Sequence, residues 1–192
     1  MFLLSISESE PGLDTMPVIK TIFYPWAEDS FKPLCYARSA VITGRGVLFD
    51  LQVFERDPVF HESDDILDDS CAALSFCFFP MKSQDVITVV LNAAREYRVY
   101  VNEKPFECAL TITKYAGADE QGWYWGVRFI VPSSLLLEVY DLTEIPNGHI
   151  MKGNIYKFKR TGNFSHIGAV APMTEPFIFS SENLAEFKAV SY

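Results

Sequence analysis

The sequence predicts an all-β protein: an antiparallel β-sandwich, immunoglobulin-like or jelly-roll-like, with one short helix. The first observation is residues 70–101, which contain three apolar runs of strand length separated by PMKSQ and NAAR. The second is the alternation within residues 86–92, where Thr88 and Asn92 make one set of side chains more polar than the other. A period of two with one wetter face indicates a half-buried antiparallel strand. The third is the regular spacing of turn residues between such runs, which is typical of sandwiches.

Before this central meander, the chain is expected to begin with a flexible N-terminal arm at residues 1–16. Residues 17–192 then form a single β-sandwich domain, since all-β domains of this size are commonly undivided. Short strands are predicted at residues 18–24, 35–42 and 47–53. The last of these has the cleanest alternation in the chain, and the TGRG turn before it indicates a hairpin.

After the meander, the alternation predicts strands at residues 108–113 and 123–131, with a turn at residues 117–122. The segment 132–140 predicts the helix, because proline suits a first helical turn and the following run is apolar. A Pro-Asn-Gly turn then precedes strands at residues 150–158 and 184–190. Between these two strands we expect a long irregular stretch.

Composition and charge restrict the function. The chain has 192 residues, is 49% hydrophobic and 15% aromatic, and carries a formal net charge of -9 at pH 7. This apolar content is ample for a core. The acidity makes nucleic acid or an anionic membrane surface an unfavourable partner, so neither is predicted. The N-terminal segment MFLLSISESEPG lacks the basic region of a signal peptide, which predicts a cytoplasmic protein and leaves a secreted module trimmed of its leader as the alternative.

Motifs for catalysis and metal binding are missing from the sequence. There is no GxSxG, HExxH, glycine-rich phosphate loop or CxxC, and the three histidines are scattered. The four cysteines lie far apart and are expected to be buried free thiols. The chain is therefore predicted not to be an enzyme and to have no cofactor or metal site. Structural calcium stays open, since residues 55–69 are rich in acids including Asp57, Glu62, Asp64 and Asp65.

A binding surface is what the residue types support. Sugar recognition uses flat aromatic faces, with directional hydrogen bonds from polar side chains to hydroxyl groups. The aromatic candidates are Trp26, Tyr36, Tyr97, Trp123 and Tyr156, and the polar candidates are Arg38, Asn92, Arg95, Asn154 and His166. Lys157, Lys159 and Arg160 form a small basic patch that we interpret as a solvated strand end.

Six stretches of the chain, in order, carry a family resemblance: residues 36–58, 68–80, 89–97, 122–136, 152–172 and 176–187. The strongest is KGNIYKFKRTGNFSHIGAVAP. The chain resembles the family 9 carbohydrate-binding modules, especially their single-domain bacterial branch. The resemblance implies a non-catalytic β-sandwich that holds a mono- or oligosaccharide. By position, Asn154 and Tyr156 match a family motif, His166 its histidine, and Asn92 the asparagine of its strand.

Residue types and resemblance together give seven predicted carbohydrate-binding residues: Asn92, Arg95, Tyr97, Trp123, Asn154, Tyr156 and His166. The chain departs from the family at several ligand positions, where it has Ala73, Val90, Val170 and Phe179. We therefore expect the scaffold to persist and the ligand site to have drifted. Two alternatives remain. A protein-interaction or structural domain would use the apolar replacements as an exposed patch, and a haem- or metal-binding relative would use Met81, Met151 or Met173.

Overall fold

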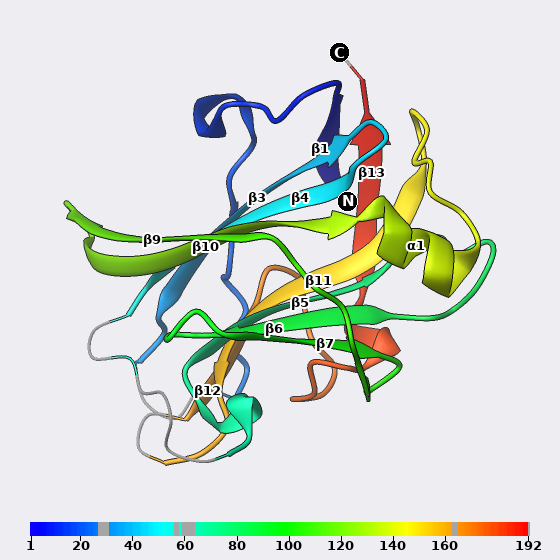
Figure 1. Ribbon diagram of the computed structural model, residues 1–192. Coiled ribbons are helices and arrows are strands. Elements are labelled where there is room, and N and C mark those ends of the chain that lie inside the picture. Colours follow the sequence, from blue (N-terminus) through cyan, green and yellow to red (C-terminus); the bar gives the residue numbers. More distant parts are fainter. Residues whose placement is uncertain (27–30, 56–57, 59–63, 163–164, 192) are drawn as a thin grey trace.

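The computed structural model describes residues 1–26, 31–55, 58, 64–162 and 165–191 (Figure 1). Its strands are β1 (Phe2–Ser7), β2 (Ile19–Lys20), β3 (Leu34–Ile42), β4 (Gly46–Phe54), β5 (Cys71–Cys77), β6 (Ile87–Asn92), β7 (Tyr97–Val101), β8 (Lys104–Phe106), β9 (Ile112–Asp119), β10 (Gly122–Pro132), β11 (Ile150–Lys159), β12 (His166–Ala169) and β13 (Ala185–Val190). The helix α1 spans Ser133–Tyr140, and three short 3₁₀ turns are η1 (Leu13–Thr15), η2 (Ile66–Asp68) and η3 (Ser181–Asn183). No helix within these described ranges is long and apolar enough to cross a bilayer.

The strands form one curled sheet that folds into two layers, so the chain is a β-sandwich. The hydrogen-bonded order is β8-β7-β6-β5-β11-β13-β1-β3-β4-β10-β9, with β12 paired to β11 and β2 to β3. Figure 1 shows β3, β4, β10 and β9 above and β11, β5, β6 and β7 below, with β13 running between the layers. We call these the upper and lower layers. The sheet is mixed where a purely antiparallel one was predicted, because β1 runs parallel to both β13 and β3.

The strand β1 replaces part of the predicted flexible arm. Leu4 is fully buried, and Phe2 and Ile6 pack against the main core. The ring of Phe2 stacks on Phe187 with centroids 4.7 Å apart. Residues 2, 4 and 6 therefore face inward while Leu3 is exposed. This period of two was visible in the sequence, but the short run gave no indication that it pairs on both sides.

Most of the other predicted elements are confirmed, but several differ. The strand β6, expected to be half-buried, is buried along its whole length, and the predicted turn at residues 117–122 is shorter because β9 continues to Asp119. The predicted strand at residues 108–113 is wrong for its first part, since residues 107–111 have no regular structure and β9 begins at Ile112. Here the Tyr97 hydroxyl accepts a hydrogen bond from Leu110 N at 3.0 Å and donates one to Cys108 O at 3.3 Å. A side chain thus satisfies backbone groups that a strand would pair. The predicted strand at 18–24 is reduced to β2, and β12 lies within the stretch expected to be irregular.

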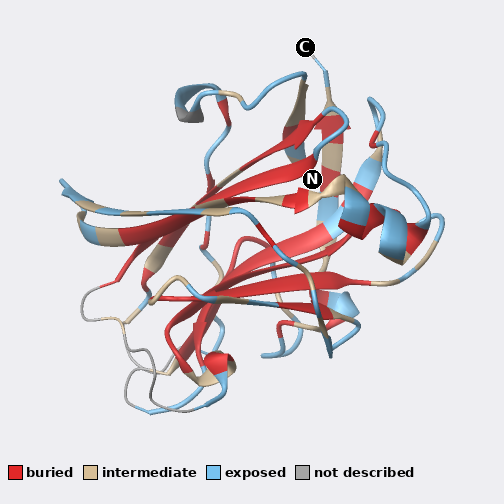
Figure 2. Ribbon diagram, in the orientation of Figure 1, coloured by how far each residue is buried: buried red, intermediate tan, exposed pale blue. Residues whose placement is uncertain are grey.

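The main core lies between the two layers, as the buried strands in Figure 2 show. Aromatic rings cross the interface: Phe49 lies 5.2 Å from Phe76, and Phe76 lies 4.8 Å from Phe187. Full burial of such a side chain contributes roughly 1.5–3 kcal/mol. This interdigitation fixes the distance between the layers.

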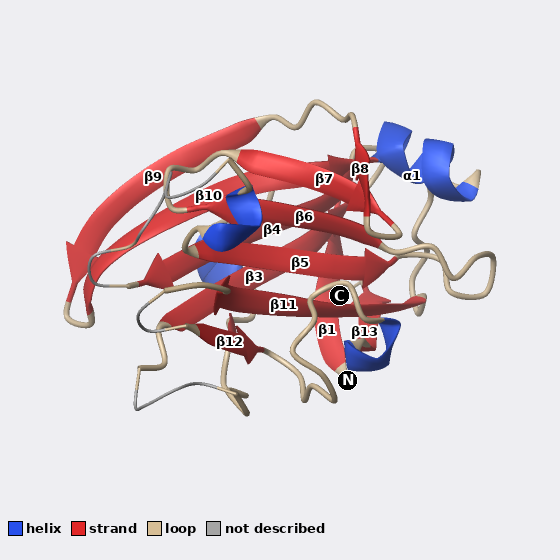
Figure 3. Cartoon of the chain, turned by 90° about the horizontal axis from the view of Figure 1, so that it is seen from below, coloured by secondary structure: helices blue, strands red, loops and turns tan. Residues whose placement is uncertain are grey.

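A second apolar cluster lies on the outer face of the lower layer. It includes Ala73, Val90, Tyr156, Phe158 and Ile178, all buried. Figure 3, seen from below, shows β5, β11 and β12 side by side with loops crossing over them. Part of the segment 173–183 supplies this cover, because Met173, Ile178 and Phe179 belong to or pack against the cluster. The edge of this cover is where an open pocket forms.

Candidate functional site

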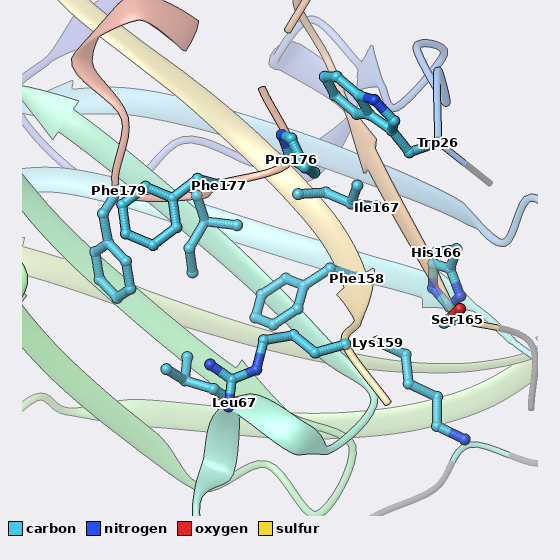
Figure 4. Close-up of a pocket in the computed structure, with 12 residues that line it drawn as sticks. Trp26, Leu67, Phe158, Lys159, Ser165, His166, Ile167, Pro176, Phe177 and Phe179 are labelled. Carbon is cyan, nitrogen blue, oxygen red and sulfur yellow. The ribbon is translucent and has the colours of Figure 1, made fainter. Parts of the chain in front are cut away.

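An open pocket of about 340 Å³ lies against the outer face of the lower layer. Five separate parts of the chain line it, and they meet where β11 and β12 pair. The lining residues are Trp26, Leu67, Phe158, Lys159, Arg160, Ser165, His166, Ile167, Pro176, Phe177, Ile178 and Phe179 (Figure 4). We call this the β12 pocket.

The β12 pocket has an apolar floor and an aromatic rim. Phe158, Ile167 and Ile178 are 2%, 9% and 6% exposed, so they form the floor. Trp26 and Phe177 are 39% and 43% exposed, so both aromatic side chains are accessible at the rim. Figure 4 shows these two side chains on opposite sides, with Ile167 and Pro176 between them. The rim therefore presents two aromatic surfaces to a ligand.

The polar side of the pocket is built around Arg160. Its Nη2 atom lies 2.9 Å from Asp65 Oδ2 and 2.8 Å from Asp68 Oδ1. Partial burial alone would lower the pKa of this guanidinium, but the hydrogen bonds and charges of the two carboxylates raise it above its ordinary value. Arg160 and the two acids thereby form a compact group of ion pairs on this side of the pocket.

His166 is the one member of the seven predicted sugar-binding residues that lines the β12 pocket. It is 4% exposed, and its ring meets the edge of Phe31 at 5.5 Å between centroids. On β12 it pairs in register with Lys159 of β11. The family resemblance predicted a ligand-binding histidine at this position, and the contacts with Phe31 and Tyr24 fix the orientation of the ring.

Asn154 and Tyr156 lie on the outer face of β11 with no exposed surface. Asn154 Nδ2 donates to Asn183 O at 2.7 Å, and its Oδ1 accepts from Ala171 N at 3.2 Å. Asn183 in turn donates to Phe177 O at 3.0 Å. Asn154 therefore holds the covering segment that carries the pocket rim. Burial raises the pKa of the Tyr156 hydroxyl, and the side chain packs in the second apolar cluster.

Asn92 and Arg95 build the turn between β6 and β7. Asn92 is fully buried, donates to Asp69 Oδ2 at 2.9 Å and accepts from Glu96 N at 2.8 Å. Arg95 has a φ of 65°, in the left-handed region. Asn92 and Arg95 therefore stabilise the turn between β6 and β7, and neither is placed to bind a sugar in the β12 pocket.

Tyr97 and Trp123 lie elsewhere. Tyr97 supports the irregular segment before β9 through its hydroxyl. Trp123 is 75% exposed at the start of β10, in the upper layer, on a hairpin that projects beyond the rest of the sheet (Figure 1). The structure therefore does not bring the seven predicted residues together in one site.

Several residues of the β12 pocket were not predicted from the sequence, and the interpretation of Lys157 was wrong. Lys157 was expected on a solvated strand end, but it is fully buried and its Nζ lies 3.2 Å from Glu55 Oε2. Phe158 and Phe177 were not singled out. The available signal for Phe158 was its place two residues after Tyr156, on the same face of β11. Phe177 lies in a segment without periodicity, which gave no signal.

The structure removes part of the support for the two alternative functions, a protein-interaction domain and a haem- or metal-binding domain. Val90 and Val170 are buried, so they do not form the exposed apolar patch expected of a protein-interaction domain. Met81 is 97% exposed, Met151 lies in the main core and Met173 packs on the second cluster, so these methionines do not share a cavity.

The predicted acidic calcium loop is only partly described. Asp57 and Glu62 lie outside the described residues. Within the part that is described, no group of three or more His, Cys, Asp or Glu side chains is arranged to hold a metal ion. Structural calcium at this loop stays a prediction.

Comparison with known proteins gives matches at the level of structure. No family model and no curated protein matches the sequence. A crystal structure from Bacteroides uniformis ATCC 8492, provisionally assigned as a carbohydrate-binding protein, superposes with a TM-score of 0.73 at 16% identity, covering 98% of this chain and 99% of that one. A family 9 carbohydrate-binding module from Caldicellulosiruptor kristjanssonii, in complex with cellotriose, gives a TM-score of 0.69 at 10% identity over 99% of this chain and 94% of that one.

A glucose complex of a family 9 module from the same organism gives a TM-score of 0.67 at 10% identity over 99% of this chain and 96% of that one. The chain has the fold of the family 9 carbohydrate-binding modules. The predicted family-9-like sandwich is thereby confirmed at the level of fold. The identity of 10–16% marks the chain as divergent from these modules.

Proposed function

We propose that this family-9-like domain is a non-catalytic saccharide-binding module whose ligand lies in the β12 pocket. The observation that carries the proposal is the pair of exposed aromatic side chains, Trp26 and Phe177, at the rim of an open pocket on a carbohydrate-binding fold. Aromatic faces stack on the C–H surfaces of sugar rings.

The size and chemistry of the pocket suit a small sugar. Its volume of about 340 Å³ falls at the lower end of small-molecule sites, which span roughly 300–1,000 Å³. Ser165, His166 and Arg160 supply polar groups along one side, beside the apolar floor. One or two sugar units would place their apolar faces on the rim and their hydroxyl groups against these side chains.

Binding without hydrolysis is supported by the ion pairs that the nearby acids make. Glycoside hydrolysis needs one carboxyl group that donates a proton and a second that acts as base or nucleophile. Asp65 and Asp68 both serve as hydrogen-bond partners of Arg160, so both carboxylates are already engaged by a guanidinium. Engaged in this way, the two acids favour binding of a saccharide over its hydrolysis.

Drift of the ligand site is supported by the second apolar cluster. Ala73 and Val90 stand where the family resemblance implies acidic side chains, and both are buried under the covering segment. Burying a carboxylate at these positions would cost several kcal/mol. With apolar side chains at these positions, the segment 173–183 can pack over the centre of the lower layer. A ligand can then bind only at the edge of this segment, where the β12 pocket lies.

The test is isothermal titration calorimetry of the full chain with glucose, cellotriose and a panel of mono- and oligosaccharides. We expect dissociation constants in the millimolar to micromolar range, equivalent to roughly 4 to 8 kcal/mol. Trp26→Ala should weaken binding by about 2- to 12-fold, the loss of one aromatic stacking contact of about 0.5–1.5 kcal/mol. Trp123→Ala removes an equally large exposed ring from the other layer and should leave binding unchanged.

The proposal fails if no saccharide of the panel gives heat, or if the two tryptophan variants lose affinity equally. Thermal unfolding of both variants should match that of the parent chain, because each side chain is substantially exposed.

A further inference from the structure

The outer face of the upper layer carries a row of charged side chains, none of which lines the β12 pocket. In the register of the sheet, Arg38 on β3 lies opposite Asp50 on β4, and Asp50 lies opposite Arg128 on β10. Two cations therefore flank one carboxylate across three adjacent strands. We call the surface formed by Tyr36, Arg38, Asp50, Gln52 and Arg128 the arginine face.

Asp50 is fully engaged by its neighbours. It is 1% exposed, its Oδ2 accepts from Arg128 Nε at 3.0 Å, and its Oδ1 accepts from the Tyr115 hydroxyl at 2.8 Å. The Tyr115 side chain crosses from β9 over Gly126, where an added Cβ would approach the ring to 2.3 Å. Burial and the charge of Asp50 raise the pKa of Tyr115, which keeps its hydroxyl a donor.

Arg38 is the surplus cation of this row. Its Nε atom is buried and has no hydrogen-bond partner among the residues that the structure describes. No carboxylate within those described ranges lies within 4.0 Å of its guanidinium, since Asp50 pairs with Arg128 instead. The Arg38 side chain as a whole is only half-buried, so a ligand that reaches its guanidinium can supply the missing counter-charge.

The neighbouring row adds a polar group and an aromatic wall. Gln52 lies opposite Tyr36, and in the described part of the chain its amide makes no side-chain hydrogen bond. Tyr36 is held by an edge contact with Phe54 at 5.3 Å and by a hydrogen bond to Gln121 Oε1 at 2.7 Å. The ammonium of Lys20 lies 5.0 Å from the Tyr36 ring centroid, which adds positive charge nearby.

We infer that the arginine face binds a carboxylate carried by an acidic saccharide, such as a uronic acid. Arg38 holds the carboxylate through its guanidinium, a geometry that suits paired hydrogen bonds. Gln52 hydrogen-bonds an adjacent hydroxyl group, and the Tyr36 ring limits the position of the sugar. On a chain with a net charge of -9, this local excess of cations selects an anion. The site is separate from the β12 pocket and does not depend on the function proposed there.

The experiment observes the arginine side chains directly. The Nε–Hε resonances of the ¹⁵N-labelled full chain are followed by NMR during titration with glucuronate, glucose, acetate and inorganic phosphate. Glucuronate should shift the Arg38 resonance in a saturable way, and glucose should not. Acetate should cause the same shift at least tenfold more weakly, because it lacks the hydroxyl groups that contact Gln52.

Variants separate this site from other cationic positions. Arg38→Gln should weaken glucuronate binding by about tenfold or more. The matched control is Arg45→Gln. Arg45 lies in the turn between β3 and β4 and already pairs with Glu10 at 2.9 Å, so this variant should bind glucuronate as the parent chain does. Trp26→Ala in the β12 pocket should likewise leave glucuronate binding intact.

Three results would overturn the inference: an Arg38 resonance that glucuronate leaves unmoved, equal losses from Arg38→Gln and Arg45→Gln, or phosphate binding as tightly as glucuronate. Acetate binding as tightly as glucuronate would overturn the saccharide assignment. The resonance titration needs only the parent chain, so the inference stays testable if Arg38→Gln fails to fold.

Discussion

The buried ion pair between Lys157 and Glu55 allows a quantitative test of the packing between the layers. The Lys157 ammonium has no exposed surface and lies 3.2 Å from Glu55 Oε2, while Glu55 Oε1 accepts from Ser70 Oγ at 2.8 Å. At 3.2 Å and an effective dielectric constant of about 20, the attraction between the charges is about 5 kcal/mol. Desolvation of both groups offsets most of it. Replacing both charges by an apolar pair of the same size should therefore change the free energy of unfolding little. Removing only one charge should lower it strongly, because the other charge stays buried without a partner.

Lys157→Met leaves the Glu55 carboxylate buried without its counter-charge, and we expect it to lower the free energy of unfolding by about 3–5 kcal/mol. Glu55→Gln should cost a similar amount, since it leaves the ammonium alone. The double variant should lose far less than the sum of the two, because it removes both charges and keeps an acceptor for Ser70. Equilibrium urea unfolding, followed by tryptophan fluorescence, measures all three variants in a double-mutant cycle.

The control is Arg45→Met, which breaks an ion pair whose side chains are 54% and 39% exposed and should cost less than about 1 kcal/mol. The reasoning is refuted if Lys157→Met costs no more than this control. It is also refuted if the losses of the two single variants simply add in the double variant.

Two further predictions concern the core and the thiols. Leu4→Ala should lower the free energy of unfolding by about 2–5 kcal/mol, because Leu4 is fully buried in a strand paired on both sides. Leu3→Ala, at the exposed neighbouring position, should lower it by less than about 1 kcal/mol. Near-identical urea midpoints for the two variants would contradict the burial of Leu4 and favour a flexible N-terminal arm. Burial raises the pKa of the Cys35 thiol to about 12. At about pH 8 iodoacetamide should therefore label the half-buried Cys108 first and label Cys35 only after unfolding. Labelling of Cys35 at early times, detected by mass spectrometry, would contradict its burial in the core.

The sequence by itself determined the fold class and most strand positions. Alternation with a period of two is a local property of the chain, and it placed β4 and β10, although β4 is buried on both faces and Trp123 at the start of β10 is exposed. Pro132 and the apolar run after it were enough to place α1, because helix starts also depend on near neighbours. The candidates Trp26 and Arg38 were chosen by residue type, and His166 also by its match to the family histidine; each lies where a ligand can be proposed.

Only the tertiary structure decided which of the candidate side chains remain open to a ligand. Asn154 and Tyr156 have the right residue types, but the segment 173–183 closes over their strand, and that segment has no periodicity by which to predict its path. The register of β3, β4 and β10 likewise brings Arg38, Asp50 and Arg128 into one row from three distant parts of the chain. Strand formation depends on neighbours in sequence, whereas the cover over a strand and its cross-strand partners depend on long-range pairing, which local patterns do not encode.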